Sequence, residues 1–495
     1  MAQLKALLKD TAIYGLSSII GRFLNYMLVP LYTAKLSAAS GGYGVITNIY
    51  SYVALILVIL TFGMETTFFR FANRKDREES PDCVFSTSFV FVGGLSLLWL
   101  ALVILFISPI SQLMGYGGHA EYVWMMAVVV ALDAIQAVPF ARLRYQKRPI
   151  RFAALKMLFI VLNIGLNLLY FVGLPKLYEI NPQLVSSVYD PTVGAGYAFF
   201  VNLICTTIIT FFFVGDMRKV CWQFSKPLLR EMLAYSWPLL LLGIAGILNQ
   251  TADKILFPYL YGEGANTQLG IYGAASKIAM IMAMITQAFR YAYEPFVFGK
   301  SNDADSKQTY AEAMKFFVIF TLLAFCAVMA YMPLLKYIIA PDYWEGLDIV
   351  PIVMAAEILM GVYFNLSFWY KLTDRTIWGA WFSGIGCAVL VAGNVLFVPQ
   401  YSYVACAWSG VAGYGTAMLL SYFVGRKHYP IDYPIAKMAI YTLATVAVCC
   451  AIAYIPSVGI VVDLAIRTVI LAVFLAVIVK LEMPELVKKI FDGSK

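Results

Sequence analysis

Long apolar stretches separated by short polar segments recur along the whole chain. Each is close to the roughly 20 residues that a helix needs to cross the hydrocarbon core of a bilayer. Lipid offers no hydrogen bonds, so a stretch of this kind satisfies its backbone groups best as a helix. The length rule predicts about fourteen spans. Their expected bounds are 11–33, 43–67, 84–107, 120–140, 151–173, 194–215, 230–257, 268–290, 311–331, 346–370, 376–398, 402–424, 436–455 and 459–480.

The composition supports the same fold class. Of the 495 residues, 61% are hydrophobic and 13% are charged, whereas about 25% of a soluble protein is charged. No loop between the spans exceeds roughly twenty residues, which is too short for a domain with its own core. We therefore expect an all-α, polytopic membrane protein in which any substrate site lies among the helices.

The basic residues predict the orientation of the spans. If both termini are cytoplasmic, the outer loops contain only Lys35, Lys176 and Lys336. Of the other 33 Lys and Arg residues, 27 fall in cytoplasmic segments and 6 within the spans. This asymmetry follows the positive-inside rule. The net charge of +8 is thus explained by membrane topology, and nothing in it requires a nucleic acid partner.

A weak internal repeat predicts two pseudo-symmetric lobes. The motif Tyr43-Gly44-Val45 near the start of the chain has a counterpart in Leu269-Gly270-Ile271. Each motif lies in the opening part of a set of six predicted spans, and repeats of this kind that rock about a central site give alternating access. The expected divisions are an N-lobe at 1–222, a C-lobe at 223–430, and two further helices with a cytoplasmic tail at 431–495.

Two basic residues fall near the middle of predicted spans in opposite halves, Arg22 and Lys277. A charge at the bilayer centre costs about 2.5–3.5 kcal/mol on insertion scales, so it usually faces a wet cavity or a partner. One interpretation is a cationic patch that binds an anionic head group such as a pyrophosphate. The alternative is a pair of interhelical salt bridges to Asp133 or Glu357.

The seventh predicted span contains candidate ion-coupling residues. Asn249 and Asp253 are four residues apart and hence on one helix face, and their oxygens suit a hard cation or a proton. Glu357 is a further candidate, with a structural counter-ion for Lys277 as the alternative. Asp253 can equally pair with a basic neighbour. Lys254 points about 100° away from Asp253, so we expect these two residues to have different partners.

Further charged residues cluster at the predicted cytoplasmic side. Arg142 and Arg144 open a dense basic segment, and with Arg290 and Lys254 they are candidate contacts for an anionic substrate. Positive-inside topology alone would also produce such a segment. Glu65 and Glu294 match across the repeat and are candidate gate residues, with solvation of helix ends as the alternative.

Residues for catalysis or resident cofactors are not evident. Gly299-Lys300-Ser301 resembles the end of a P-loop, but the position that needs the earlier glycine is Glu294. His119 and His428 lie in different loops, so no metal site is expected. We expect no enzyme activity, no cofactor and no metal. Energy would come from a Na⁺ or H⁺ gradient or from the substrate gradient.

Several short motifs together resemble one family of transporters, the bacterial polysaccharide flippases of the Wzx type in the multidrug/oligosaccharidyl-lipid/polysaccharide exporter superfamily. The resemblance extends over essentially the whole chain. The motifs that carry it are Tyr14-Gly15, Gly21-Arg22, Pro30-Leu31-Tyr32, Tyr43-Gly44, Asp253-Lys254-Ile255-Leu256, Leu269-Gly270-Ile271-Tyr272 and Glu294-Pro295-Phe296.

This resemblance implies a V-shaped fold of two lobes in the bacterial cytoplasmic membrane. It implies translocation of an undecaprenyl-pyrophosphate-linked oligosaccharide to the outer leaflet, as in the synthesis of O-antigen and lipopolysaccharide. Arg22 and Lys277 match the type of residue that binds the pyrophosphate in related lipid II flippases, and Asp253 matches a sodium-binding acidic residue. Expected partners are the lipid-linked substrate, membrane lipids and other polysaccharide-assembly proteins. The alternatives are a cation-coupled multidrug exporter and a membrane glycan polymerase.

Overall fold

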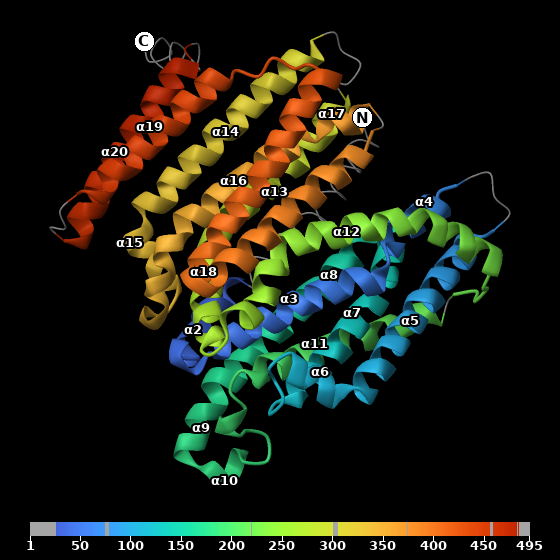
Figure 1. Cartoon of the computed structure of the whole chain (residues 1–495). Coiled ribbons are helices and arrows are strands. Elements are labelled where there is room, and N and C mark those ends of the chain that lie inside the picture. The colour runs from blue at the N-terminus through green and yellow to red at the C-terminus, as the bar shows by residue number, and fades with distance from the viewer. Residues whose placement is uncertain are drawn as a thin grey trace, which may run out of the picture. The chain divides into compact units, whose positions relative to one another are not determined.

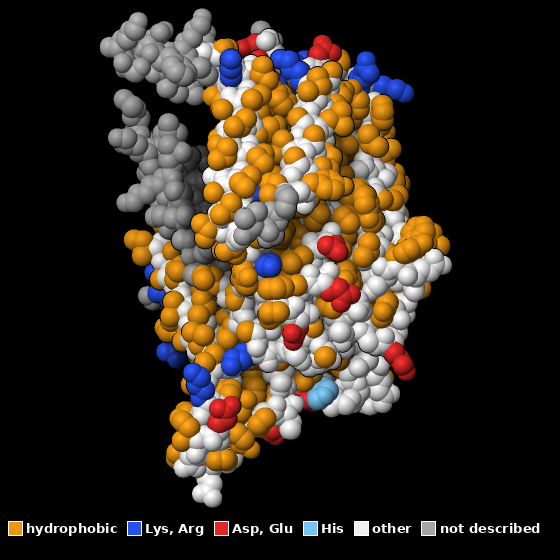
Figure 2. Space-filling view, turned by 90° about the vertical axis from the view of Figure 1, so that its left-hand side faces the viewer, with side chains coloured by type: hydrophobic (Ala, Val, Ile, Leu, Met, Phe, Trp, Pro, Cys, Tyr) orange, Lys and Arg blue, Asp and Glu red, His pale blue; other side chains and the backbone are white. Residues whose placement is uncertain are grey.

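The computed structural model describes residues 26–74, 79–218, 220–299, 305–373, 375–455, 459–482 and 484. Within these residues every regular element is helical (Figure 1), which confirms the all-α prediction. Twelve of the helices are long and apolar enough to cross a membrane. The face in Figure 2 is mostly hydrophobic, as expected for a surface that contacts lipid.

The chain divides into two compact units. Unit 1 contains the described residues up to Ala274 together with Asn394–Tyr403. Its helices are α2 (Leu28–Lys35), η1 (Ala38–Ser40), α3 (Gly42–Thr61), α4 (Met64–Ala72), α5 (Pro81–Leu105), α6 (Ile107–Leu113), α7 (Ala120–Tyr145), α8 (Pro149–Leu168), η2 (Leu169–Gly173), α9 (Leu174–Ile180), α10 (Pro182–Val185), η3 (Pro191–Val193), α11 (Gly196–Met217) and α12 (Lys226–Tyr261).

Unit 2 contains Ala275–Gly393 and the described residues from Val404 onwards. Its first helix, α13 (Ala265–Gly299), begins in unit 1. The others are α14 (Ser306–Ala330), α15 (Met332–Leu335), η4 (Lys336–Ile338), η5 (Pro341–Ile349), α16 (Val350–Leu366), α17 (Phe368–Leu372), α18 (Ile377–His428), α19 (Ile435–Ala453) and α20 (Ile460–Glu482).

The predicted spans agree well with these helices. Every predicted span after the first has a helical counterpart, whereas most of the span 11–33 lies outside the described residues. The helix α18 covers two predicted spans, and its backbone is non-helical at Ser402, with φ 53° and ψ −143°. The count of about fourteen spans and the cytoplasmic location of both termini stay predictions.

Helix starts follow local sequence signals. Ser80 precedes α5 and its hydroxyl accepts a hydrogen bond from the backbone N–H of Cys83, while Pro81 occupies the first turn. Ser225 caps α12 in the same way through the N–H of Leu228. Proline in the first turn loses no helical hydrogen bond, and a serine cap satisfies one of the unpaired N–H groups.

Gly44, at the start of α3, lies against the first turns of α13 within unit 1. A Cβ atom on Gly44 would lie 1.8 Å from the carbonyl oxygen of Asn266 and 2.9 Å from the backbone nitrogen of Gly270. Only glycine permits this approach. Gly44 and Gly270 are the matched glycines of the predicted repeat, so the repeat motif marks a close contact between backbones.

The ends of α14, α19 and α20 are joined by an ion cluster around Glu482. Its carboxylate accepts hydrogen bonds from Lys315 Nζ at 2.6 Å and from the Tyr441 hydroxyl at 2.7 Å. Lys437 Nζ lies 3.9 Å from the same carboxylate. This cluster attaches the two C-terminal helices, which lie side by side in Figure 1, to α14.

The compact units do not coincide with the predicted domain boundaries. The helix α12 belongs to unit 1, whereas the repeat would assign it to the C-lobe. The compact units are defined by contacts between helices, whereas the predicted lobes are defined by the sequence repeat. The division at 222/223 and at 430/431 therefore stays a prediction about the repeat.

We expect Gly44→Ala to lower the thermal unfolding midpoint of the purified protein. The added methyl would overlap the Asn266 carbonyl, and overpacking of this kind costs about 1–3 kcal/mol. The matched control is Gly93→Ala in α5, where a Cβ atom would meet nothing within 4 Å and where alanine favours the helix. A Gly44→Ala variant that unfolds no earlier than Gly93→Ala would contradict the contact.

Candidate functional site

Among the described residues, three of the polar sites bear on function, and each lies within one unit. The arginine pocket is in unit 1 and is lined by Arg142, Gln146, Arg148 and Asp216, with Phe85 as its aromatic wall. The Asp253 cluster is also in unit 1 and consists of Asp253, Lys254, Tyr272 and Asn48. The Arg290 pocket is in unit 2 and contains Thr286, Arg290, Phe364, Asn365 and Lys371.

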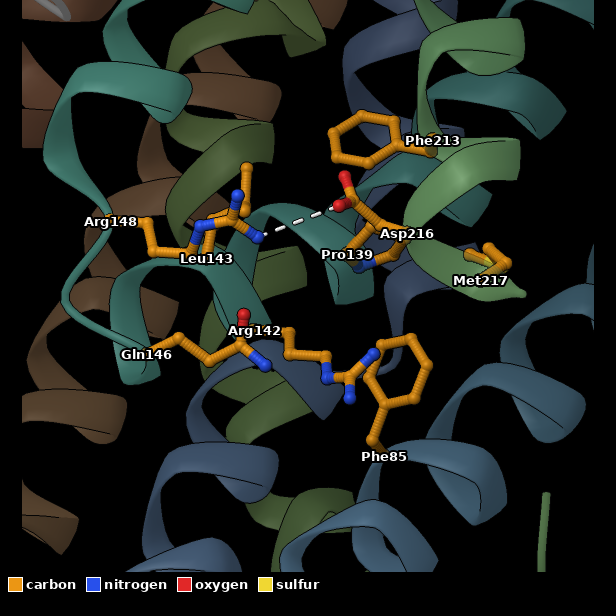
Figure 3. Close-up of a pocket in the computed structure, with 9 residues that line it drawn as sticks. All are labelled: Phe85, Pro139, Arg142, Leu143, Gln146, Arg148, Phe213, Asp216 and Met217. Carbon is orange, nitrogen blue, oxygen red and sulfur yellow. Dashed lines mark ion pairs between the residues drawn. The ribbon is translucent and has the colours of Figure 1, made fainter. Parts of the chain in front are cut away.

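The arginine pocket lies where α5, α7 and α11 meet (Figure 3). Its cavity volume is about 60 Å³. The guanidinium carbon of Arg142 lies 4.6 Å from the centre of the Phe85 ring, which is cation–π distance. Its guanidinium also donates a hydrogen bond to Asp82 at 2.7 Å.

The other arginines of this segment also have acidic partners. Arg144 forms an ion pair with Glu65 of α4. Asp216 of α11 lies 3.5 Å from Arg148, as drawn in Figure 3, and 2.7 Å from Arg151. These pairs connect α7 and α8 to α4, α5 and α11, so they stabilise the end of unit 1.

These pairings bear on two predictions. The structure gives Arg142 and Arg144 acidic protein partners, and a substrate phosphate would have to compete with Asp82 and Glu65. Glu65, a candidate gate residue, bonds within unit 1. Roles for these residues in substrate binding or gating therefore stay predictions.

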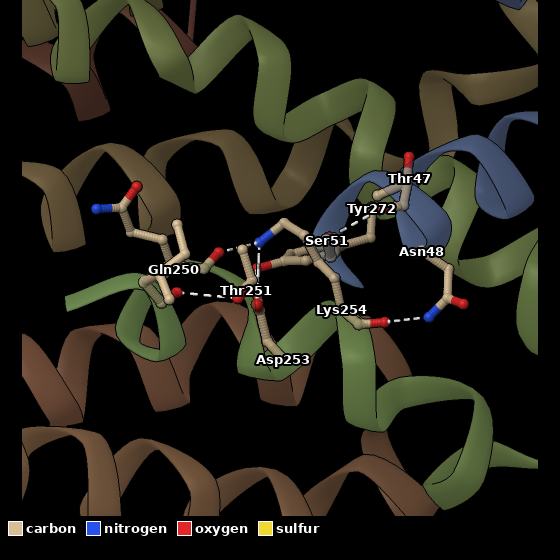
Figure 4. Close-up of polar contacts among 9 residues, drawn as sticks. Thr47, Asn48, Ser51, Gln250, Thr251, Asp253, Lys254 and Tyr272 are labelled. Atoms are coloured by element: carbon tan, nitrogen blue, oxygen red, sulfur yellow. Dashed lines mark hydrogen bonds and ion pairs between the residues drawn. The ribbon is translucent and has the colours of Figure 1, made fainter. Parts of the chain in front are cut away.

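The Asp253 cluster corrects one prediction (Figure 4). Lys254 Nζ donates to both oxygens of Asp253, at 3.0 and 2.8 Å, so the expectation of different partners is wrong. The backbone positions do diverge by one helical step, but the long lysine side chain folds back. Its Nζ also donates to the Gln250 carbonyl at 3.0 Å.

A tyrosine completes this ion pair. The hydroxyl of Tyr272 on α13 donates to Asp253 Oδ2 at 2.5 Å. Asp253 is buried, with 8% of its side chain exposed, so an unpaired charge there would be costly. A cation that bound to Asp253 would have to displace Lys254 or bind beside it.

The Asp253 cluster extends to α3 through Asn48. The amide of Asn48 donates to the Lys254 carbonyl at 2.8 Å, and its oxygen accepts from the Tyr116 hydroxyl at 2.8 Å. Burial raises the pKa of Tyr116 above its usual value, so this hydroxyl stays a donor. Asn249, the predicted partner of Asp253 in ion binding, donates to the Ala245 carbonyl at 2.9 Å.

The Arg290 pocket combines cations, aromatic rings and unsatisfied polar atoms. The Arg290 guanidinium lies 4.7 Å from the centre of the Phe364 ring, and Lys371 also lines the pocket. Thr286 Oγ1 and Asn365 Oδ1 are buried and have no hydrogen-bond partner among the described residues. Buried polar atoms are rarely left so, and here they face a site with positive charge.

Sequence reasoning identified Arg290 but missed its neighbours. Thr286 and Arg290 are four residues apart on α13, and Asn365 and Phe368 are three apart at the end of α16 and the start of α17. These spacings place each pair on one helix face and were a usable signal. The convergence of the two faces depends on the packing of α13 against α16, which the sequence alone does not show.

The structure gives less detail on the remaining candidate site residues. Lys277 and Glu357 are half-buried in α13 and α16, and both have polar or electrostatic partners. Their roles in substrate binding and ion coupling stay predictions. Arg22 lies outside the described residues, as does the side chain of Glu294.

Comparison with known families identifies the family to which this protein belongs. Residues 7–292 match the family described as "Polysaccharide biosynthesis protein". The chain belongs to this polysaccharide biosynthesis family. The match covers more than half of the chain and includes α2 to α12, the Asp253 cluster and Arg290.

Relatives of this polysaccharide biosynthesis protein agree with that assignment. It is 19% identical over 301 residues to "Lsg locus putative protein 1" of Haemophilus influenzae, covering 59% of this chain and 65% of the relative. Its fold matches "Lipid II flippase MurJ, inward closed conformation" with a TM-score of 0.73 at 14% identity, covering 94% of this chain and 98% of the other.

A second solved structure has the same fold. The "Inward-facing conformation of a multidrug resistance MATE family transporter of the MOP superfamily" matches with a TM-score of 0.61 at 15% identity, covering 88% of this chain and 96% of the other. These matches confirm the resemblance to polysaccharide flippases of this superfamily. The chain is a multi-pass membrane protein of the polysaccharide biosynthesis family, and its fold is shared with a lipid II flippase and a multidrug transporter.

We expect Lys254→Met to destabilise the protein by about 3 kcal/mol, because breaking a buried ion pair leaves an uncompensated carboxylate at Asp253. The double variant Asp253→Asn/Lys254→Met removes both charges and should recover most of that loss. A double-mutant cycle of unfolding free energies measures the coupling. Additive effects of the two substitutions would show that the ion pair contributes nothing.

Proposed function

We propose that this protein is a flippase that moves a polyprenyl-pyrophosphate-linked oligosaccharide from the inner to the outer leaflet of the bacterial cytoplasmic membrane. The match to the polysaccharide biosynthesis family carries the proposal. The fold shared with a lipid II flippase is consistent with a lipid-linked substrate. The carrier expected for such a substrate is undecaprenyl pyrophosphate, and O-antigen or lipopolysaccharide synthesis is the expected context.

The Arg290 pocket has the chemistry that such a head group requires. Arg290 supplies a planar guanidinium that suits phosphate oxygens, and Lys371 adds a second positive charge. Thr286 offers a hydroxyl and Asn365 an acceptor, which match the hydroxyl groups of a sugar. The rings around them give apolar faces on which sugars can stack. Lys277 and Arg22 are further candidate contacts for the pyrophosphate.

The transport step would follow the alternating-access scheme of repeat-built transporters. Coupling to a Na⁺ or H⁺ gradient is part of the proposal, with Asp253, Asn249 and Glu357 as candidate residues. Membrane lipids and other polysaccharide-assembly proteins are the proposed partners.

Multidrug export is the second candidate, because the fold is shared with multidrug transporters. Such a protein would need to bind lipophilic cations. Among the described residues, the wall of the Arg290 pocket has two basic side chains and no acidic one. This charge favours the anionic, lipid-linked substrate.

The test is complementation of a strain that lacks the gene. Loss of surface glycan with accumulation of the lipid-linked intermediate on the cytoplasmic face, both reversed by the wild-type gene, is the expected result. Unchanged glycan together with lower cellular accumulation of a lipophilic cation would replace the proposal with drug export. A purified protein that elongates a lipid-linked glycan would replace it with a polymerase.

We expect Arg290→Gln to restore surface glycan poorly. Loss of a charge-assisted hydrogen bond costs about 1.5–3 kcal/mol, which corresponds to at least about tenfold weaker binding of the pyrophosphate. The matched control is Arg375→Gln, because Arg375 is exposed and lies outside the pocket. Membrane levels of both variants are compared by immunoblot. Equal complementation at equal levels would exclude Arg290 from the substrate site.

A further inference from the structure

Asp133 lies near the middle of α7 and is only half-buried by its neighbours. Among the described residues it has no ion pair within bonding distance. Its one hydrogen bond comes from the Thr206 hydroxyl, at 3.4 Å. This is a weak contact for a carboxylate, which normally accepts shorter, charge-assisted bonds.

The surroundings of Asp133 provide one cation, but at a distance. Lys156 on α8 interacts with Asp133 electrostatically. Its Nζ lies instead over the Phe140 ring, 4.1 Å from the ring centre. Tyr50 on α3 also interacts with Asp133 electrostatically. In the described part of the chain, α4, α5 and α6, which also pack against α7, contribute no charged group that interacts with Asp133.

The other acidic residues of unit 1 described above have ion-pair partners. Asp82, Glu65 and Asp216 each form an ion pair with an arginine, and Asp253 has both Lys254 and Tyr272. An ionised carboxylate without such partners in a membrane span is costly. A proton removes the charge without any change in packing. Asp133 therefore has the environment of a carboxyl group that binds a proton.

A line of polar side chains runs from Asp133 through unit 1. Thr206 Oγ1 lies 3.5 Å from Asn202, whose amide donates to the Tyr50 hydroxyl at 2.9 Å. Asn202 is near the start of α11, at the end of unit 1 that the charge pattern predicts to be outside. The line therefore connects Asp133 to the hydrogen-bonded groups of α11 and α3 in unit 1.

We propose that Asp133 is a proton-binding site in unit 1, which holds a proton in this arrangement and releases it when Lys156 or another cation comes within ion-pair distance. The proton site itself does not depend on the substrate. Its use as the coupling site for transport rests on the proposed function. A proton-coupled flippase would then carry its coupling carboxyl on α7, separate from the Asp253 cluster.

Infrared spectroscopy of the full-length protein in lipid nanodiscs tests the site directly. A protonated carboxyl group has a C=O stretching band that a carboxylate lacks, and carbon-13 labelling of aspartate identifies its source. At neutral pH we expect an aspartic acid band in the wild type that disappears in alkali. The band should be lost in Asp133→Asn and retained in Asp253→Asn, because the proposal assigns the proton to Asp133.

Two results would overturn the proposal: a wild type without an aspartic acid band at neutral pH, or a band that survives in Asp133→Asn. If Asp133→Asn does not fold, Asp133→Glu serves in its place. With labelled aspartate, the labelled band should vanish in Asp133→Glu and an unlabelled glutamic acid band should replace it.

A transport measurement tests the coupling separately. Vesicles that contain the protein and a fluorescent polyprenyl-pyrophosphate oligosaccharide are given a pH gradient, and flipping is followed by quenching. We expect the gradient to change the rate for the wild type and to have no effect on Asp133→Asn. A wild type that flips without response to pH overturns the coupling role. A wild type that does not flip this lipid counts against the proposed function and leaves the infrared result standing.

Discussion

Charged side chains inside an apolar bundle must find partners in the protein, because lipid supplies none. This constraint explains much of the arrangement described above. The arginines at the end of α7 and the start of α8 are paired with acids on α4, α5 and α11. The Glu482 carboxylate bonds to Lys315 and Tyr441 and so connects α20 to α14 and α19 in unit 2. In both units the ion pairs therefore hold helices together, and a transport function has to be sought where this pairing is incomplete.

In the Arg290 pocket, two buried oxygens are left unsatisfied among the described residues. Two basic residues share it with the unsatisfied oxygens of Thr286 and Asn365. Leaving a buried oxygen without a hydrogen bond costs about 1–3 kcal/mol, and a protein that only had to fold would gain by filling the site with apolar groups. The cost is understandable if a ligand with hydroxyl and phosphate groups satisfies these atoms in another step of the cycle.

Features that depend on consecutive residues were predicted from the sequence better than features that depend on residues far apart in the chain. The spans were predicted because hydrophobic length is a property of consecutive residues, and α5, α7 and α11 begin and end within a few residues of expectation. The partner of Lys254 was predicted wrongly because direction along a helix says little about a flexible four-carbon side chain. Thr286 and Asn365 were missed because neither residue forms part of a site until the faces of α13 and α16 pack together. Gly44 and Gly270 stood out as a repeat, but their contact is visible only in the packed structure.

Asp253 and Asp133 represent two different ways to couple an ion to movement. At Asp253 the carboxylate already has a cation, so an incoming Na⁺ would have to compete with Lys254, and binding would release a lysine side chain. Asp133 has no basic side chain within ion-pair distance among the described residues, so a proton is the simplest way to neutralise it. Exchange at the first site would rearrange α12 against α13, since Tyr272 shares the carboxylate. Exchange at the second would alter the attraction between α7 and α8, because Lys156 is the nearest charge of opposite sign. Binding of Na⁺ at the first site or of a proton at the second adds one positive charge to unit 1, because the displaced Lys254 remains part of the protein. A pH gradient acts directly on the site that exchanges a proton, which is Asp133 in this proposal.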